Sequence, residues 1–104
     1  MTISPGDQVK LDFKNIKDGD GVPYDPATVK FHYKAPGEAV VTVVYPAAGT
    51  SKIETGWYRC VVSVPYDQDS VGWWKCDAQG LDDSNVSLLV KNLSFEVQST
   101  GTLA

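Results

Sequence analysis

The chain has 104 residues, 42% hydrophobic and 11% aromatic, which suits one globular domain and excludes an intrinsically disordered chain. Its 13 acidic and nine basic residues give a net charge of −4, and the basic residues are scattered, so no nucleic acid is expected as a partner. No apolar run approaches the roughly 20 residues that cross a bilayer, so no membrane is expected as a partner either.

The first half of the chain predicts four β-strands separated by turns. They are expected over residues 8–14, 28–34, 39–45 and 52–54. In the first two, apolar and polar side chains alternate strictly, which is typical of strands with one buried face. Their expected core residues are Val9, Leu11, Phe13, Phe31 and Tyr33. The glycine, proline and aspartate clusters between the strands indicate turns.

The middle of the chain predicts a β-hairpin. Its first strand, turn and second strand are expected over residues 56–65, 66–70 and 71–78. Asp and Ser residues in the turn favour a chain that folds back about Gln68, so that Cys60 faces Cys76. The core face of the hairpin then carries Tyr58, Cys60, Val62, Val64, Trp74 and Cys76. Trp57 and Trp73 fall together on its outer face.

The two cysteines, Cys60 and Cys76, are therefore expected to be neighbours in the core. Directly opposed residues of antiparallel strands have Cα atoms about 4.5–5.5 Å apart, which a disulfide can bridge. A protein made in a cytoplasm normally keeps its thiols reduced, so a disulfide and a pair of buried thiols both stay open. With a single histidine, His32, the two cysteines make half a zinc site at best, and no metal is expected.

No catalytic pattern is present in the sequence. His32 falls in the outward phase of its strand, between Lys30 and Lys34, and no Ser-His-acid or Cys-His-acid arrangement can be built from it. Residues 18–21, Asp-Gly-Asp-Gly, lack the ligand spacing and closing glutamate of a calcium loop and are interpreted as a turn. We therefore expect neither an enzyme nor a cofactor.

The predicted binding surface combines outward tryptophans with a long apolar strand. Residues 86–97 are expected to form a final strand or strand pair, kinked near residues 91–92, which at a sheet edge would offer its backbone to another chain. Exposed tryptophans are enriched in interfaces, although residues 52–55 or the C-terminal tail could instead cover one of them. The partner-binding residues predicted in this way are Trp57, Trp73, Val86, Leu88 and Val90. Such a contact would depend on apolar burial and be little affected by salt.

These elements together predict one all-β domain. Short strands separated by regular turns, without helical periodicity, favour an immunoglobulin-like antiparallel β-sandwich of seven to eight strands. The domain is expected to span residues 1–104, with its core within residues 6–98 and with flexible ends.

Five short motifs are spread over residues 6–98. They are Gly6-Asp7-Gln8-Val9-Lys10-Leu11, Asp18-Gly19-Asp20-Gly21-Val22-Pro23-Tyr24-Asp25-Pro26-Ala27-Thr28-Val29, Pro36-Gly37, Thr55-Gly56-Trp57-Tyr58 and Gly72-Trp73-Trp74. Together they resemble a pattern found in small immunoglobulin-like proteins of tailed bacteriophages, often encoded among virion structural genes. Tyr58 and Cys60 also resemble the Tyr-x-Cys of immunoglobulin domains. The tryptophan-bearing strand follows them here, so the disulfide that joins the two sheets of an antibody domain is not carried over.

The resemblance implies a non-enzymatic virion structural protein that docks other virion proteins in an oligomeric assembly. It favours a tail adaptor, at a baseplate or tail fibre, over a capsid decoration or head–tail joining protein. Its location would be the virion, after assembly in the host cytoplasm, since the N-terminus shows no signal-peptide pattern. A bacterial surface adhesion module of immunoglobulin-like fold is the alternative, which the missing signal disfavours.

Overall fold

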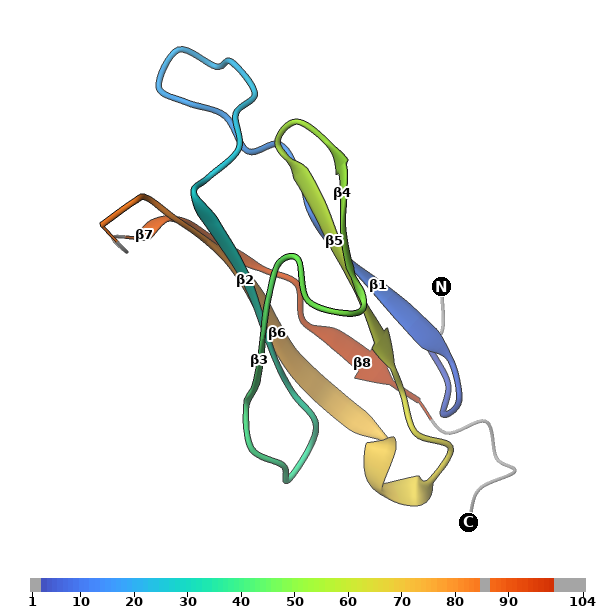
Figure 1. Ribbon diagram of the computed structural model, residues 1–104. Coiled ribbons are helices and arrows are strands. Elements are labelled where there is room, and N and C mark those ends of the chain that lie inside the picture. The colour runs from blue at the N-terminus through green and yellow to red at the C-terminus, as the bar shows by residue number, and fades with distance from the viewer. Residues whose placement is uncertain (1–2, 85–86, 99–104) are drawn as a thin grey trace.

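The described part of the chain contains eight strands and one short 3-10 helix, joined by turns and loops. The computed structural model describes residues 3–84 and 87–98. The strands are β1 (Gln8–Phe13), β2 (Thr28–Lys34), β3 (Val41–Val44), β4 (Thr50–Glu54), β5 (Trp57–Ser63), β6 (Gly72–Leu81), β7 (Ser87–Asn92) and β8 (Phe95–Val97). The 3-10 helix η1 (Gln68–Ser70) lies between β5 and β6 (Figure 1). The all-β class predicted from the sequence is confirmed.

The strands form two antiparallel sheets that enclose one core, as in a β-sandwich. One sheet has the order β1-β5-β4. The other has the order β3-β2-β6-β7, and β8 also pairs with β6. Figure 1 shows the two sheets as separate layers, with β1, β5 and β4 in one and β2, β6 and β8 in the other.

The expected hairpin between residues 56–65 and 71–78 is wrong, because its two strands belong to different sheets. Cys60 of β5 lies opposite Leu11 and Thr50, whereas Cys76 of β6 lies opposite Tyr33. The connection contains η1, whose N-terminus is capped by Asp67: its Oδ1 accepts a hydrogen bond of 2.9 Å from the backbone N–H of Ser70. This helical turn carries the chain across the core instead of back along the same sheet.

The predicted inward faces are nevertheless the buried ones. All six residues expected on the core face of the hairpin are buried, and so are Leu11, Phe13 and Phe31. Val9 and Tyr33, also expected in the core, are partly buried and pack against it. Alternation has a period of two in any strand, so it identifies the buried face whichever strand lies alongside.

Trp74 is the most extensively fixed aromatic side chain of the core. Its indole stacks on Phe95 with ring centroids 5.5 Å apart and on Tyr33 at 6.4 Å. Its Nε1–H donates a hydrogen bond of 2.9 Å to the carbonyl oxygen of Ser70. The buried polar atom is therefore satisfied, and η1 is tied to the strand that follows it.

The last two strands, β7 and β8, pair with successive lengths of β6. β7 lies along Asp77–Leu81 and β8 along Gly72–Trp74. Between them, the backbone N–H of Leu93 donates to the carbonyl oxygen of Cys76 at 2.9 Å, and the Ser94 hydroxyl accepts from the Cys76 N–H at 3.0 Å. The interruption therefore falls just after the kink expected near residues 91–92.

Candidate functional site

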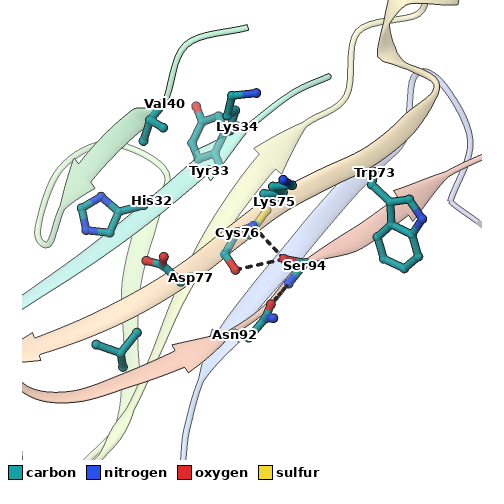
Figure 2. A pocket seen from close by; sticks show the side chains of 11 residues that line it. His32, Tyr33, Lys34, Val40, Trp73, Lys75, Cys76, Asp77, Asn92 and Ser94 are labelled. Atoms are coloured by element: carbon teal, nitrogen blue, oxygen red, sulfur yellow. Dashed lines mark hydrogen bonds between the residues drawn. The ribbon is translucent and has the colours of Figure 1, made fainter. Parts of the chain in front are cut away.

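A groove of about 610 Å³ lies on the outer face of the five-stranded sheet (Figure 2). We call it the outer groove, and its principal lining residues are His32, Lys34, Trp73, Lys75, Asp77 and Val90. They come from β2, β6 and β7, and the neighbouring side chains of β2 and β6 on the opposite face belong to the core. The sheet therefore holds the groove residues on a rigid base.

The polar side chains of the outer groove face one another across β2 and β6. His32 lies opposite Asp77, and Lys34 lies opposite Lys75. Residues that are directly opposed in a sheet project from the same face, so all four side chains point away from the core. The Nδ1 of His32 lies 3.0 Å from the hydroxyl oxygen of Thr42 on β3, which fixes the imidazole against the edge of the sheet.

The apolar side chains of the outer groove are unusually accessible. Trp73 is 60% exposed, and Val40 and Val90 are 59% and 57% exposed. Two of these, Trp73 and Val90, are among the partner-binding residues predicted from the sequence. They line the same groove although they lie on different strands, β6 and β7.

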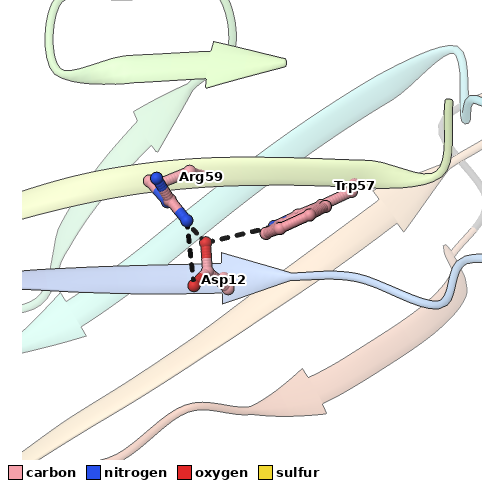
Figure 3. Close-up of polar contacts among 3 residues, drawn as sticks. All are labelled: Asp12, Trp57 and Arg59. Carbon is pink, nitrogen blue, oxygen red and sulfur yellow. Dashed lines mark hydrogen bonds and ion pairs between the residues drawn. The ribbon is translucent and has the colours of Figure 1, made fainter. Parts of the chain in front are cut away.

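Trp57, the other predicted docking tryptophan, lies elsewhere. It belongs to β5 in the three-stranded sheet, so the expectation that Trp57 and Trp73 share one outer face is wrong. Its Nε1–H donates to Asp12 Oδ1 at 3.1 Å, and the same oxygen accepts from Arg59 Nε at 2.7 Å (Figure 3). Arg59 and Lys14 both lie over the ring, each 5.6 Å from its centroid. Charged side chains therefore hold this tryptophan on the sheet, beside Glu54, its register partner on β4. Residues 99–104 of the tail, the other expected cover, lie outside the described residues.

Asp12 is the centre of that cluster. Burial alone would raise the pKa of Asp12, but hydrogen bonds from Arg59 and Trp57, with the charges of Arg59 and Lys14, lower it below its ordinary value. The carboxylate is thus held in its charged form by three neighbours. This arrangement stabilises the outer face of the three-stranded sheet and leaves Trp57 only partly accessible.

The other predicted docking residues lie on β7 or just before it. Val86 lies outside the described residues, and so does the side chain of Leu88. β7 is the terminal strand in the order β3-β2-β6-β7, so its second edge has no partner strand within residues 3–84 and 87–98. Such an edge presents backbone donors and acceptors that another strand can bind.

Cys60 and Cys76 are both buried in the core as free thiols. Burial raises the pKa of Cys60, and it raises the pKa of Cys76 to about 12. Because β5 and β6 belong to different sheets, the two cysteines come from opposite sides of the core, and the expectation that they face each other in one antiparallel pair is wrong.

Comparisons of the chain with known protein families, with curated proteins and with solved structures found no match. Within the described ranges, no helix has the length and apolar character needed to cross a membrane. In the same part of the chain, no three His, Cys, Asp or Glu side chains gather where they could hold a metal ion. The role of the protein is therefore inferred from the geometry of its two sheet faces.

Proposed function

We propose that this chain is a non-enzymatic virion structural protein of a tailed bacteriophage, which docks other virion proteins through the outer groove. We further propose that its sandwich is immunoglobulin-like and that it acts as an adaptor at a baseplate or tail fibre. The virion setting is supported by the resemblance of the turn and core motifs. The docking role is supported by the groove itself.

The exposure of Trp73 carries the proposal. Tryptophan buries more apolar area than any other side chain, and leaving it 60% exposed on a sheet face has no benefit for the isolated domain. Val40 and Val90 extend the apolar surface on either side of the charged pairs. An aromatic anchor on a rigid sheet, surrounded by polar groups, has the composition of a protein-binding surface.

The proposed role is tested by incorporation of variants into phage particles. Trp73→Ala should fold, as judged by circular dichroism, but should be depleted from purified particles. Tyr66→Ala is the matched control, because Tyr66 is 67% exposed and lies outside the outer groove. Incorporation of Trp73→Ala at the wild-type level would place the docking surface elsewhere.

Electron microscopy of particles that carry a labelled copy separates the possible locations. Label on the tail supports the adaptor. Label on the head would favour a capsid decoration protein, and label at the neck would favour a head–tail joining protein. Absence from particles, together with binding to bacterial cells, would favour the surface adhesion module.

A further inference from the structure

Lys34 of β2 and Lys75 of β6 lie directly opposite each other in the antiparallel register. Both line the outer groove, next to the exposed ring of Trp73. Like charges in this position repel and destabilise a sheet. Neither ammonium group has an ion-pair partner among the residues that the structure describes, whereas Lys52 and Arg59 are each paired with an aspartate. The lysine pair therefore lowers the folding stability of the isolated domain.

The charge of the outer groove is opposite to that of the whole chain. The chain has a net charge of −4, but among the described residues Asp77 is the single carboxylate that lines the groove, against the two lysines. Asp77 lies opposite His32 and Asn92 in the register, not opposite either lysine. The lining residues of the groove thus carry more positive than negative charge, beside apolar side chains, and Glu96 of β8 lies opposite Trp73 at its edge.

We propose that the outer groove binds an acidic segment of a partner protein. Carboxylates of the segment would lie against Lys34 and Lys75, and an apolar side chain would cover Trp73. This inference rests on the proposed docking function and names the chemistry of the partner. It also revises the expectation that binding is little affected by salt, because two unpaired lysines now lie at the centre of the contact.

The apolar walls of the groove favour a polypeptide over a free anion. A bound phosphate group would leave the side chains of Trp73, Val40 and Val90 exposed to solvent. A segment that alternates acidic and apolar residues would contact both the lysines and these apolar side chains. Two lysines are also too few to follow a nucleic-acid backbone, which requires several phosphate contacts. The occupant is therefore an acidic polypeptide with interspersed apolar residues.

The proposal is tested by NMR titration of the ¹⁵N-labelled protein with two probes. One is a capped five-residue peptide that alternates glutamate with leucine, and the other replaces each glutamate with lysine. The acidic peptide should shift the amide signals of residues 73–77 and the indole signal of Trp73. Its affinity should fall severalfold between about 50 and 500 mM NaCl, because added salt screens exposed charges.

Charge-reversal variants separate the groove from general electrostatics. Lys75→Glu should raise the dissociation constant of the acidic peptide about tenfold or more. Lys10→Glu is the control, since it makes the same charge change at an exposed position of β1, in the other sheet. The proposal would be overturned if the protein bound both peptides with equal affinity or bound neither. It would also be overturned if Lys75→Glu and Lys10→Glu lost affinity for the acidic peptide equally.

Two further measurements distinguish the ways in which it could fail. Sedimentation of the wild type tests for self-association, and a dimer that Lys75→Glu abolishes would show that the groove binds a second copy instead. In the particle assay, Trp73→Ala could be depleted from particles while Lys75→Glu is incorporated normally. That result would support the docking function and reject the acidic partner. Normal incorporation of Trp73→Ala would reject the docking function, while the titration still reports on the acidic peptide.

Discussion

The backbone N–H of Gly56 donates a hydrogen bond of 3.0 Å to Oδ1 of Asp25, a residue 31 positions earlier in the chain. The other oxygen of Asp25 accepts from Lys52 Nζ at 2.6 Å. Burial and a hydrogen bond with Asp25 raise the pKa of Tyr58 to about 12. One carboxylate therefore ties the loop before β2 to both β4 and β5. Two of the sequence motifs, one containing Asp25 and one containing Gly56 and Tyr58, meet at this point.

Gly56→Ala should destabilise the domain by about 1–3 kcal/mol. Gly56 has φ of +78°, and a Cβ at this position would lie 2.7 Å from the carbonyl oxygen of Ile16. Gly37→Ala is the control: its φ is similar, +75°, but a Cβ there meets nothing within 4 Å. Urea denaturation should show a larger loss of unfolding free energy for Gly56→Ala than for Gly37→Ala. Equal losses would mean that backbone strain, and not the contact with Ile16, accounts for the whole effect.

The stability of the domain should fall in acid, in part because of Asp25. Its hydrogen bond with Lys52, followed by that from the Gly56 N–H, lowers the pKa of Asp25 below its ordinary value of 3.8. A lowered folded-state pKa contributes stability above the ordinary value, and that contribution is lost as the pH falls through the folded-state pKa. Urea denaturation at a series of pH values should show a shallower decline in Asp25→Asn than in Glu38→Gln. Identical acid profiles would contradict the assignment.

Lys75→Glu should stabilise the fold while it weakens binding of the acidic peptide. The substitution converts a like-charge pair with Lys34 into an opposite-charge pair, which is worth a few tenths to about 1 kcal/mol in a sheet. The double variant Lys34→Glu with Lys75→Glu restores a like-charge pair. Its unfolding free energy should return toward the wild-type value, yet it should still bind the acidic peptide more weakly than the wild type does. A stability loss in the single variant would show that the lysine pair is not costly.

Adjacent tryptophans of β6 should respond very differently to truncation. Trp74→Ala removes the stacking partner of Phe95 and Tyr33 and should cost about 3–5 kcal/mol. Trp73→Ala removes an exposed ring and should change stability by about 0.5 kcal/mol or less. Urea denaturation of the two variants measures the contrast, and similar losses would contradict the assigned faces.

The thiols of Cys60 and Cys76 should resist alkylation in the native protein. The reactive species is the thiolate, and burial raises the pKa of both groups, that of Cys76 to about 12. Iodoacetamide at about pH 8 should therefore label them only after denaturation. Rapid labelling of the native protein would contradict their burial. Labelling that requires a reductant as well as denaturant would reveal a disulfide.

Burial could be predicted from the sequence more fully than pairing could. Alternation places Trp74 inward and Trp73 outward in any sheet, and the structure agrees. A five-residue polar segment, however, is compatible with a hairpin turn and also with a connection that crosses to the other sheet. In the structure, the helical turn capped by Asp67 and Ser70 forms such a crossing connection between β5 and β6. The cysteines were therefore assigned to the correct faces but to the wrong neighbours.

The candidate site was partly predictable for the same reason. Trp73 was predicted from its outward phase, and Val90 from its place in a long apolar strand at a sheet edge. Lys34 and Lys75 did not, because each is an ordinary surface lysine until the register of β2 and β6 places one opposite the other. Their outward phases were available from the sequence, but the order of strands in the sheet was not. The position of Trp57 was hidden similarly, since Asp12 reaches it through the pairing of β1 with β5.

The division of the last strand between β7 and β8 limits the length of any strand that joins this edge. The far side of β8 is already occupied, because Ile3 pairs with Val97 and accepts a hydrogen bond from the Gln98 N–H at 2.8 Å. At Leu93 the backbone N–H turns toward Cys76 and leaves the edge. An incoming strand can therefore match only the six residues of β7. It would present about three side chains to each face of the enlarged sheet. A short linear segment can therefore pair with the backbone donors and acceptors of β7 as completely as a strand of a whole domain can.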